Sequence, residues 1–411
     1  MKKVTTLLML FFPLLLVAQR KAVFIIADGI PADLIEKLPT PNLHAIARQG
    51  ALLKAHVGGE RGGYSQTPTI SAVGYNSLLT STWVNKHNVW GNDIKAPNYN
   101  YWTLFRILKS QRPAATTAVY STWLENRTLL VGDGRPETGQ LKIDFHLDGL
   151  ERDTIAFPQD KNSEYIHRID EIIVDSAAAC VRANGPDLSW VYLQYTDDMG
   201  HDFGNSEPFY HAIDLMDQQV GRIWKAVQYR QEKFGEEWQI FITTDHGRDS
   251  IMGKNHGGQS NRERNTWIVT NAKDLNEYSR MNPGIVDIAP TILRFLKITI
   301  PRAQAIEMDG IPLTGKLSLV HPTAAVDNNI LRLQWQAMEK TGNVKIWITS
   351  TNRFKTGGID DYKLLAEVPV AKGSFQMPAS SIPSGDMSKI VWEAPHNTMN
   401  RWLNAPISKK P

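Results

Sequence analysis

The sequence predicts an α/β fold, with a mostly parallel sheet sandwiched by helices and a small β-sandwich toward the C-terminus. Three observations lead to this prediction. Continuous apolar runs of strand length alternate with helical patterns over most of the chain, and the final quarter instead alternates apolar and polar residues. At 411 residues, the chain is also too long for one ordinary core, which favours one large domain and a smaller module.

Five apolar runs predict strands that are buried on both faces, because they are continuous rather than alternating. They lie at residues 21–27, 115–120, 190–195, 238–244 and 266–270. Helical patterns lie between them, at residues 41–50, 101–110, 164–183 and 208–232. Such alternation implies a largely parallel sheet covered on both faces. In such sheets the functional residues gather at the carboxyl ends of the strands.

The N-terminus has the pattern of a signal peptide, predicted to span residues 1–18. Two lysines, Lys2 and Lys3, precede a short apolar run that ends before Ala18 and Gln19. The short run and its Pro13 argue against a spanning helix, although an uncleaved anchor is the alternative. We therefore expect a periplasmic or secreted protein with no stable membrane span after cleavage.

The remaining chain is expected to form two domains. Residues 19–317 would form the large domain, with a small cap or insertion at about 93–160, where glycine, proline and charge are mixed. Residues 318–411 would form a β-sandwich of the fibronectin type III kind, because short alternating runs are separated by turns. No catalytic residues are evident in this C-terminal module.

Composition excludes some classes of function. Hydrophobic content of 42% and charged content of 21% are those of a globular protein. A net charge of +3, with no Lys/Arg run interleaved with aromatics, predicts no nucleic-acid-binding surface. Cys180 is the only cysteine, so no internal disulfide is possible, and its apolar helical context predicts a buried thiol.

Seven residues at strand ends and glycine-marked loops have the chemistry of a two-metal phosphoryl-transfer site. Three carboxylates, three imidazoles and one hydroxyl suit two divalent ions, most plausibly zinc, with a nucleophile between them. These residues are Asp28, Ser71, Asp197, His201, Asp245, His246 and His256.

The spacing of the ligands supports this hypothesis. Asp197 and His201 are four residues apart, so on a helical turn both side chains can reach one cation, although a surface ion pair has the same spacing. Asp245 and His246 are adjacent, and can act together only beyond the strand end, where Gly247 permits a bend.

Ser71 is the predicted nucleophile, at the start of a helical segment. Backbone amides at a helix N-terminus favour an alkoxide and can bind a phosphate oxygen. The alternative is an ordinary N-cap serine, and Thr67 and Thr69 are rival hydroxyls. Asn92 could donate its amide to a non-bridging phosphate oxygen.

These motifs resemble the alkaline phosphatase superfamily and, within it, the type I phosphodiesterase/nucleotide pyrophosphatase group. The resemblance covers residues 21–317. Two single positions and four short segments carry the resemblance. The positions are Asp28, after the first strand, and Ser71, nine residues before Thr80, and the segments are residues 87–92, 197–201, 244–247 and 256–257.

The resemblance implies an alkaline phosphatase-like fold and a division of the ligands between two zinc ions. One ion would be held by Asp197, His201 and His256. The other would be held by Asp28, Asp245 and His246 together with Ser71, and Asn92 would bind phosphate.

The expected function is hydrolysis of a small phosphate ester, such as a nucleotide, through a seryl-phosphate intermediate. No arginine clamp is visible beside Ser71, which favours diesters over monoesters. The pair Ser71–Ala72 instead resembles the phosphomonoesterases, so an alkaline phosphomonoesterase is the alternative. A non-catalytic exported binding protein and a phosphoglycerate mutase of the same fold are further alternatives. Five aromatic residues could stack on a base or form core: Trp83, Trp90, Tyr99, Tyr101 and Trp102.

Overall fold

The computed structural model describes residues 18–383, 385 and 387–403. The predicted signal peptide, except Ala18, lies outside these residues. Within the described part of the chain, no helix has both the length and the apolar character needed to cross a membrane.

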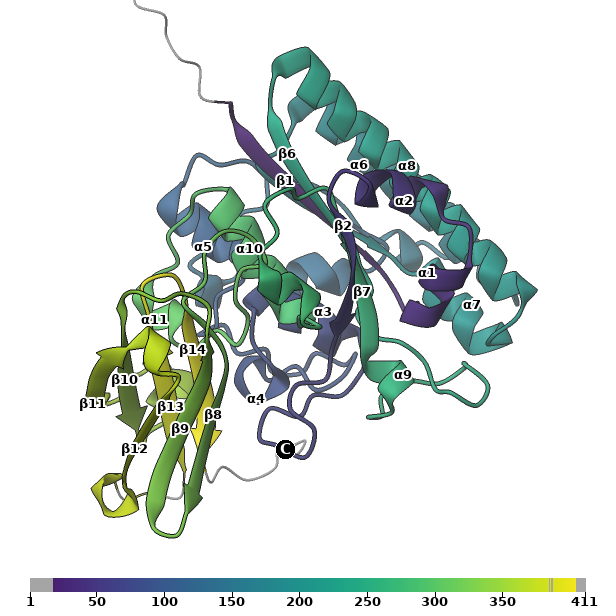
Figure 1. Ribbon diagram of the computed structural model, residues 1–411. Coiled ribbons are helices and arrows are strands. Elements are labelled where there is room, and N and C mark those ends of the chain that lie inside the picture. The colour runs from purple at the N-terminus through teal and green to yellow at the C-terminus, as the bar shows by residue number, and fades with distance from the viewer. Residues whose placement is uncertain (1–17, 384, 386, 404–411) are drawn as a thin grey trace, which may run out of the picture.

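A seven-stranded sheet with strand order β2-β7-β6-β1-β5-β3-β4 forms the centre of the fold (Figure 1). Its strands are β1 Arg20–Ala27, β2 Ala51–His56, β3 Thr117–Ser121, β4 Phe145–Leu147, β5 Leu188–Leu193, β6 Glu237–Thr243 and β7 Asn265–Thr270. β1 pairs in parallel with both β5 and β6, β3 and β4 continue the parallel order, and β7 is antiparallel to its neighbours.

The five predicted strands are all present, with ends shifted by at most two residues. β2 and β4 were not predicted, for physical reasons that differ. β2 is an edge strand paired only with β7, so it lacks a continuous apolar run and exposes 38% of Leu52. β4 has only three residues, too few to give a pattern.

Helices cover both faces of the sheet (Figure 1). On one face lie α1 Ala32–Lys37, α2 Pro41–Ala47, α6 Glu164–Asn184, α7 Tyr195–Phe203 and α8 Glu207–Phe234. On the other lie α3 Ser71–Thr80, α5 Leu104–Gln111 and α10 Ile288–Phe295. Along β1, Phe24 and Ile26 pack toward the second layer, whereas Val23 and Ile25 pack toward the first. The short helices are α4 Val84–His87, α9 Asn261–Arg264 and α11 Arg302–Ala305.

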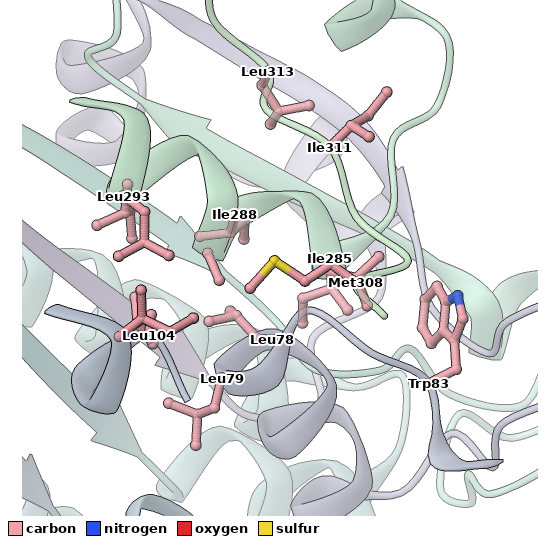
Figure 2. Close-up of a cluster of buried hydrophobic side chains, with 14 of the residues drawn as sticks. Leu78, Leu79, Trp83, Leu104, Ile285, Ile288, Leu293, Met308, Ile311 and Leu313 are labelled. Carbon is pink, nitrogen blue, oxygen red and sulfur yellow. The ribbon is translucent and has the colours of Figure 1, made fainter. Parts of the chain in front are cut away.

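Helix α3 is held in place by an apolar cluster (Figure 2). Leu78 on α3 points toward Met308, on the segment that follows α10, and all ten residues of α3 are buried. Each such side chain contributes about 1.5–3 kcal/mol when it is removed from water. The N-terminus of α3, which carries Ser71, is therefore fixed by packing at the opposite end of the helix.

Two antiparallel sheets follow the α/β unit, and Figure 1 shows them beside α11. One has the order β11-β10-β13-β14 and the other β12-β9-β8. Their strands are β8 Leu319–Asp327, β9 Ile330–Ala337, β10 Asn343–Thr349, β11 Lys363–Pro369, β12 Ser374–Pro378, β13 Ser388–Glu393 and β14 Thr398–Leu403. The predicted fold class is confirmed.

The predicted domain boundaries, by contrast, remain predictions. Trp335, Ile346 and Trp392 of the C-terminal sheets belong to the same apolar cluster as α3 and α10, so packing is continuous across residue 317. The region predicted as a cap contributes β3 and β4 to the central sheet.

Candidate active site

Three predicted carboxylate ligands lie at the carboxyl ends of three neighbouring strands. Asp28 directly follows β1, Asp245 follows β6 after one residue, and Asp197 lies in the first turn of α7, which follows β5. Because β1 lies between β6 and β5, their ends bring the three carboxylates together. All three are buried. Three buried carboxylates at one place are costly unless cations compensate them.

His246 joins Asp28, Asp245 and Ser71 into a first group. Its Nε2 atom lies 3.4 Å from Asp28 Oδ1, 3.1 Å from Asp245 Oδ2 and 3.4 Å from Ser71 Oγ. His246 Nδ1 lies 2.9 Å from the Gly247 carbonyl oxygen, which can only accept, so Nδ1 carries the proton. The lone pair of Nε2 therefore faces two carboxylate oxygens, which is the arrangement of metal ligands.

Two of these oxygens have no hydrogen-bond partner among the described residues. Asp28 Oδ2 accepts bonds from the hydroxyls of Tyr75 and Tyr192, but Asp28 Oδ1 is unpartnered, as is Asp245 Oδ2. Burial, followed by the charges of Asp245 and Asp197, raises the pKa of Asp28 well above its ordinary value. Burial and the charge of Asp197 raise the pKa of Asp245 to about 8. A divalent cation between these oxygens would remove the unfavourable interaction, so the residues fit a metal ion.

Asp197, His201 and His256 form a second group. His201 Nε2 lies 3.4 Å from Asp197 Oδ2 and 3.0 Å from His256 Nε2. His256 Nδ1 donates to the Thr69 carbonyl at 2.8 Å, so its Nε2 also presents a lone pair. The predicted turn is present, because Asp197 and His201 both lie on α7.

The two groups adjoin each other. The rings of His246 and His256 are stacked with centroids 3.7 Å apart. Ligand atoms of Asp197, His201 and His256 lie within 4.8 Å of one another, as do those of Asp28, Asp197 and His246. Asp197 therefore belongs to both groups, whereas the resemblance assigned it to one ion only.

Arg248 is a central residue that was not predicted. Its fully buried guanidinium donates to the Gly29 carbonyl at 2.9 Å, the Lys254 carbonyl at 3.1 Å, and both the carbonyl (2.7 Å) and carboxylate of Asp197. Burial alone would raise the pKa of Asp197, but the Arg248 charge and the neighbouring histidines hold it well below its usual range. The only signal in the sequence is that Arg248 directly follows the Asp-His-Gly motif.

Gly200 makes room for this arginine. A Cβ atom at position 200 would lie 2.2 Å from the guanidinium carbon of Arg248. The glycine between Asp197 and His201 is thus required by the close approach of Arg248 to α7.

Ser71 opens onto a cavity of about 280 Å³. Asn92 lines it as well, and its Oδ1 accepts from the Ala72 amide at 3.0 Å, which leaves the Asn92 amide nitrogen free to donate. The rival hydroxyls have backbone partners: Thr69 Oγ1 donates to the Gly258 carbonyl and Thr67 Oγ1 to the Ser65 carbonyl.

The rest of the cavity lining comes from the region predicted as a cap or insertion, from α6 and from the turn before α7. Its side chains are Trp123, Glu151, Gln159, Tyr165, Ile166 and Gln194. None of the five aromatic residues considered for stacking lines it. Trp83 instead lines a separate cavity of about 500 Å³ beside β14, which contains none of the predicted ligands.

Comparison with known proteins identifies the family. The family described as type I phosphodiesterase / nucleotide pyrophosphatase matches residues 22–291. The chain belongs to this family. The predicted resemblance is confirmed, and this membership supports the predicted enzyme class, a hydrolase of phosphoric ester bonds.

Curated relatives match this chain over shorter stretches. A 2,3-bisphosphoglycerate-independent phosphoglycerate mutase of Gracilaria tenuistipitata var. liui is 30% identical over 145 residues, which are 34% of this chain and 26% of that protein. The GPI ethanolamine phosphate transferase 2 of Schizosaccharomyces pombe is 32% identical over 137 residues, which are 28% and 18% of the two chains. The chain thus spans about a quarter or less of the length of these relatives.

Two solved structures are similar to parts of this chain. Murine ectonucleotide pyrophosphatase/phosphodiesterase 5 has a TM-score of 0.46 at 14% identity, covering 68% of this chain and 96% of that one. A 2-O GAG sulfatase has a TM-score of 0.47 at 11% identity, covering 88% and 85%.

Proposed function

We propose that this protein is an exported, two-metal phosphodiesterase that acts on a small phosphate ester such as a nucleotide. The observation that carries the proposal is the pair of unpartnered, buried carboxylate oxygens beside Ser71, Asp28 Oδ1 and Asp245 Oδ2. Export rests on the signal-peptide pattern of residues 1–18.

Two metal ions would be held by the two groups of side chains. Asp28, Asp245 and His246, with Ser71, would hold one ion, and the second would be held by Asp197, His201 and His256. Nitrogen and carboxylate donors of this kind fit zinc. When bound, the ions would neutralise the negative charge that develops on the attacking and leaving oxygens.

Ser71 would act as the nucleophile. Its Oγ loses the hydroxyl proton and forms a bond to phosphorus while the bond from phosphorus to one ester oxygen breaks, and the departing alkoxide takes up a proton in exchange. Water then attacks the seryl phosphate, releasing the second product and restoring the Ser71 hydroxyl. The first amides of α3 and the Asn92 amide nitrogen would orient the non-bridging oxygens.

Diesters are favoured over monoesters by the charge of the cavity wall. Among the described residues no Lys, Arg or His lines the 280 Å³ cavity, and Arg248 is already bonded to Asp197 and to backbone carbonyls. A monoester dianion gains most from an additional cationic clamp, which this wall lacks. An alkaline phosphomonoesterase on the same site is the second candidate, because Ser71 is followed by Ala72 as in that group.

Initial rates on two model esters test the proposal. Zinc-loaded protein is assayed on bis-p-nitrophenyl phosphate and on p-nitrophenyl phosphate, each with and without a chelator. We expect faster turnover of the diester, and loss of turnover on chelation that returns when zinc is restored. A preference for the monoester would make the protein a phosphatase, and no turnover of either ester would favour a binding protein.

A further inference from the structure

We propose that the cavity of about 500 Å³ between the α/β unit and the C-terminal sheets is a second, non-catalytic binding site. It would take a small ring-bearing molecule with an anionic oxygen group, through His56, His321 and Arg401. The inference goes beyond the proposed function, because neither Ser71 nor any predicted metal ligand lines this cavity.

Three basic side chains from three different strands line the cavity. His56 is the last residue of β2 in the central sheet, whereas His321 lies on β8 and Arg401 on β14. β8 and β14 are edge strands of the two C-terminal sheets and lie next to each other (Figure 1). The site is therefore complete only where the C-terminal sheets pack against the α/β unit.

None of these three side chains forms an ion pair within the described part of the chain. Arg401 Nη1 donates to the Asn400 carbonyl at 2.7 Å, and no other hydrogen bond of this guanidinium is found among the described residues. His56 Nδ1 lies 2.8 Å from the Asn282 carbonyl oxygen, so Nδ1 carries the proton and Nε2 remains available. Arg401 is half-buried and His321 is exposed, so a ligand can reach both.

Electrostatic repulsion acts among the three groups. Burial lowers the pKa of His56, and the charges of Arg264 and His321 lower it further. Burial and the charge of Arg401 lower the pKa of His321. An anionic group between them would offset this repulsion, and hydrogen bonds between charged groups are roughly twice as strong as neutral ones. The cluster therefore favours an anion over a neutral or cationic ligand.

The carboxylates of the lining do not supply this anion. Asp287 accepts bonds from two backbone amides, at 2.6 and 2.7 Å, and from the Tyr278 hydroxyl at 3.0 Å. Asp309 is paired with Lys86 at 2.6 Å. Glu60 is exposed, so water and salt screen its charge. The two buried carboxylates are thus already bonded within the protein.

Aromatic rings beside the imidazoles provide a surface for the organic part of the ligand. The ring centroids of His56 and Trp83 are 6.1 Å apart, and those of His321 and Tyr278 are 5.7 Å apart. Tyr64 also lines the cavity. A volume of about 500 Å³ is that of a small-molecule pocket, with room for a ring beside the anionic group.

The backbone of His321 has a conformation that is uncommon for a residue other than glycine. Its φ of +50° is in the left-handed region. It lies where the pairing of β8 with β9 shifts register, between Val320 and Thr323. Irregularities of this kind redirect a side chain, and unfavourable backbone conformations cluster at ligand sites. This conformation occurs at a residue that lines the cavity, which supports a binding role.

Calorimetric titration of the zinc-loaded protein tests the inference. The probes are phenyl sulfate, phenyl methanesulfonate, in which a methyl group replaces the charged oxygen, and inorganic sulfate. We expect phenyl sulfate to bind about tenfold more tightly than the neutral ester, and more tightly than inorganic sulfate, which has no ring. In Arg401→Met, which keeps the apolar stem, and in His321→Asn, which tolerates the left-handed backbone, the ratio of the two ester affinities should fall most of the way to one.

The matched control is Arg280→Met. Arg280 is exposed and close to Tyr278 in sequence, but it does not line the cavity, so the ratio should stay as in the parent. The unfolding temperature without ligand shows that each variant is folded. Equal affinity of the parent for the charged and neutral esters would overturn the inference. A ratio that stays at the parent value in both Arg401→Met and His321→Asn would also overturn it, because the anion would then bind elsewhere.

Chelation separates this site from the active site. The titration of phenyl sulfate is repeated with a chelator, and we expect an affinity within about twofold of the zinc-loaded value, because no predicted metal ligand lines the cavity. Loss of binding on chelation would assign the anion to the active site and overturn the inference. Since binding is measured without turnover, the result does not depend on whether the proposed phosphodiesterase activity is found.

Discussion

Ser71 depends on its surroundings for any reactivity, because an ordinary serine hydroxyl is a weak nucleophile. It combines a helix N-terminus, a neighbouring imidazole and two carboxylate oxygens without hydrogen-bond partners. Thr69, the nearest rival, uses its hydroxyl to bridge the backbone of Gly257 and Gly258.

Replacement of this serine gives the sharpest prediction at the residue scale. We expect Ser71→Ala to lower kcat on bis-p-nitrophenyl phosphate by on the order of a thousandfold or more, with zinc content close to normal. Thr69→Ala is the control and should retain most activity. If Ser71→Ala keeps turning over and Thr69→Ala does not, Thr69 is the nucleophile.

Arg248 is a positioning residue, because it contacts the predicted ligand Asp197 and does not line the cavity beside Ser71. Removal of its guanidinium leaves the Asp197 carboxylate and three backbone carbonyls without a buried donor. We expect Arg248→Ala to weaken zinc binding by about 10–100-fold, measured by competition with a chromogenic chelator. Arg248→Lys keeps the charge but not the planar fork, so it should recover only part of the affinity. Unchanged zinc affinity in Arg248→Ala would show that the ligands hold their positions without it.

At the scale of elements, the order β6-β1-β5 assembles the site from helices and loops that are far apart in sequence. One buried side chain, Asp170 on α6, fixes the turn between β5 and α7. It accepts from the Gln194 amide at 3.1 Å, the Tyr195 amide at 2.9 Å and the hydroxyl of Thr122. Asp170 therefore orients the helix that carries Asp197 and His201.

The titration of Asp170 predicts how stability changes with pH. Burial raises the pKa of Asp170 to about 7 in the folded protein, against about 4 when unfolded. Between these values the folded state retains a proton that the unfolded state has lost, so this contribution to stability decreases as pH rises from about 4 to about 7. Its slope is at most about 1.4 kcal/mol per pH unit. The free energy of unfolding is measured by urea denaturation between about pH 4 and about pH 7 for the parent protein and for Asp170→Asn. We expect the variant to lack the contribution of Asp170 to the slope of this free energy against pH. An unchanged slope would mean that other groups cause the pH dependence.

At the scale of the whole molecule, buried ion pairs join the C-terminal sheets to the α/β unit. Lys389 on β13 is fully buried and bonds the carboxylate of Glu307, with Asp360 at 3.3 Å. Lys86 on α4 likewise pairs with Asp309 at 2.6 Å and donates to Asn400 on β14 at 2.9 Å. Together with the shared apolar cluster, these contacts predict that the two parts unfold together.

Lys389→Ala tests this coupling. The substitution leaves two buried carboxylates without their cation, so we expect the free energy of unfolding to fall by about 3–5 kcal/mol within one cooperative transition. Lys345→Ala, at an exposed position of β10, is the matched control and should change it by less than about 0.5 kcal/mol. Two separate transitions, with only one shifted by Lys389→Ala, would show that the sheets unfold independently.

The sequence alone determined five of the seven strands of the central sheet, several of the helices and the residue types of the site. These features depend on local patterns: an apolar run marks a buried strand, and a spacing of four places Asp197 and His201 on one side of α7. Family motifs linked these residues to phosphoryl transfer, and the structure brings all the predicted ligands into two adjoining groups.

Only the tertiary structure decided how these residues are supported and what surrounds them. Arg248 contacts Asp197 on α7, Tyr75 and Tyr192 reach Asp28 from α3 and β5, and Glu151 joins the cavity lining from a distant segment. Nothing in their local sequence reveals these contacts, because each depends on the packing of segments that are far apart in the chain. The predicted ligands follow from short-range pattern, whereas their electrostatic environment and the lining of the cavity follow from long-range packing.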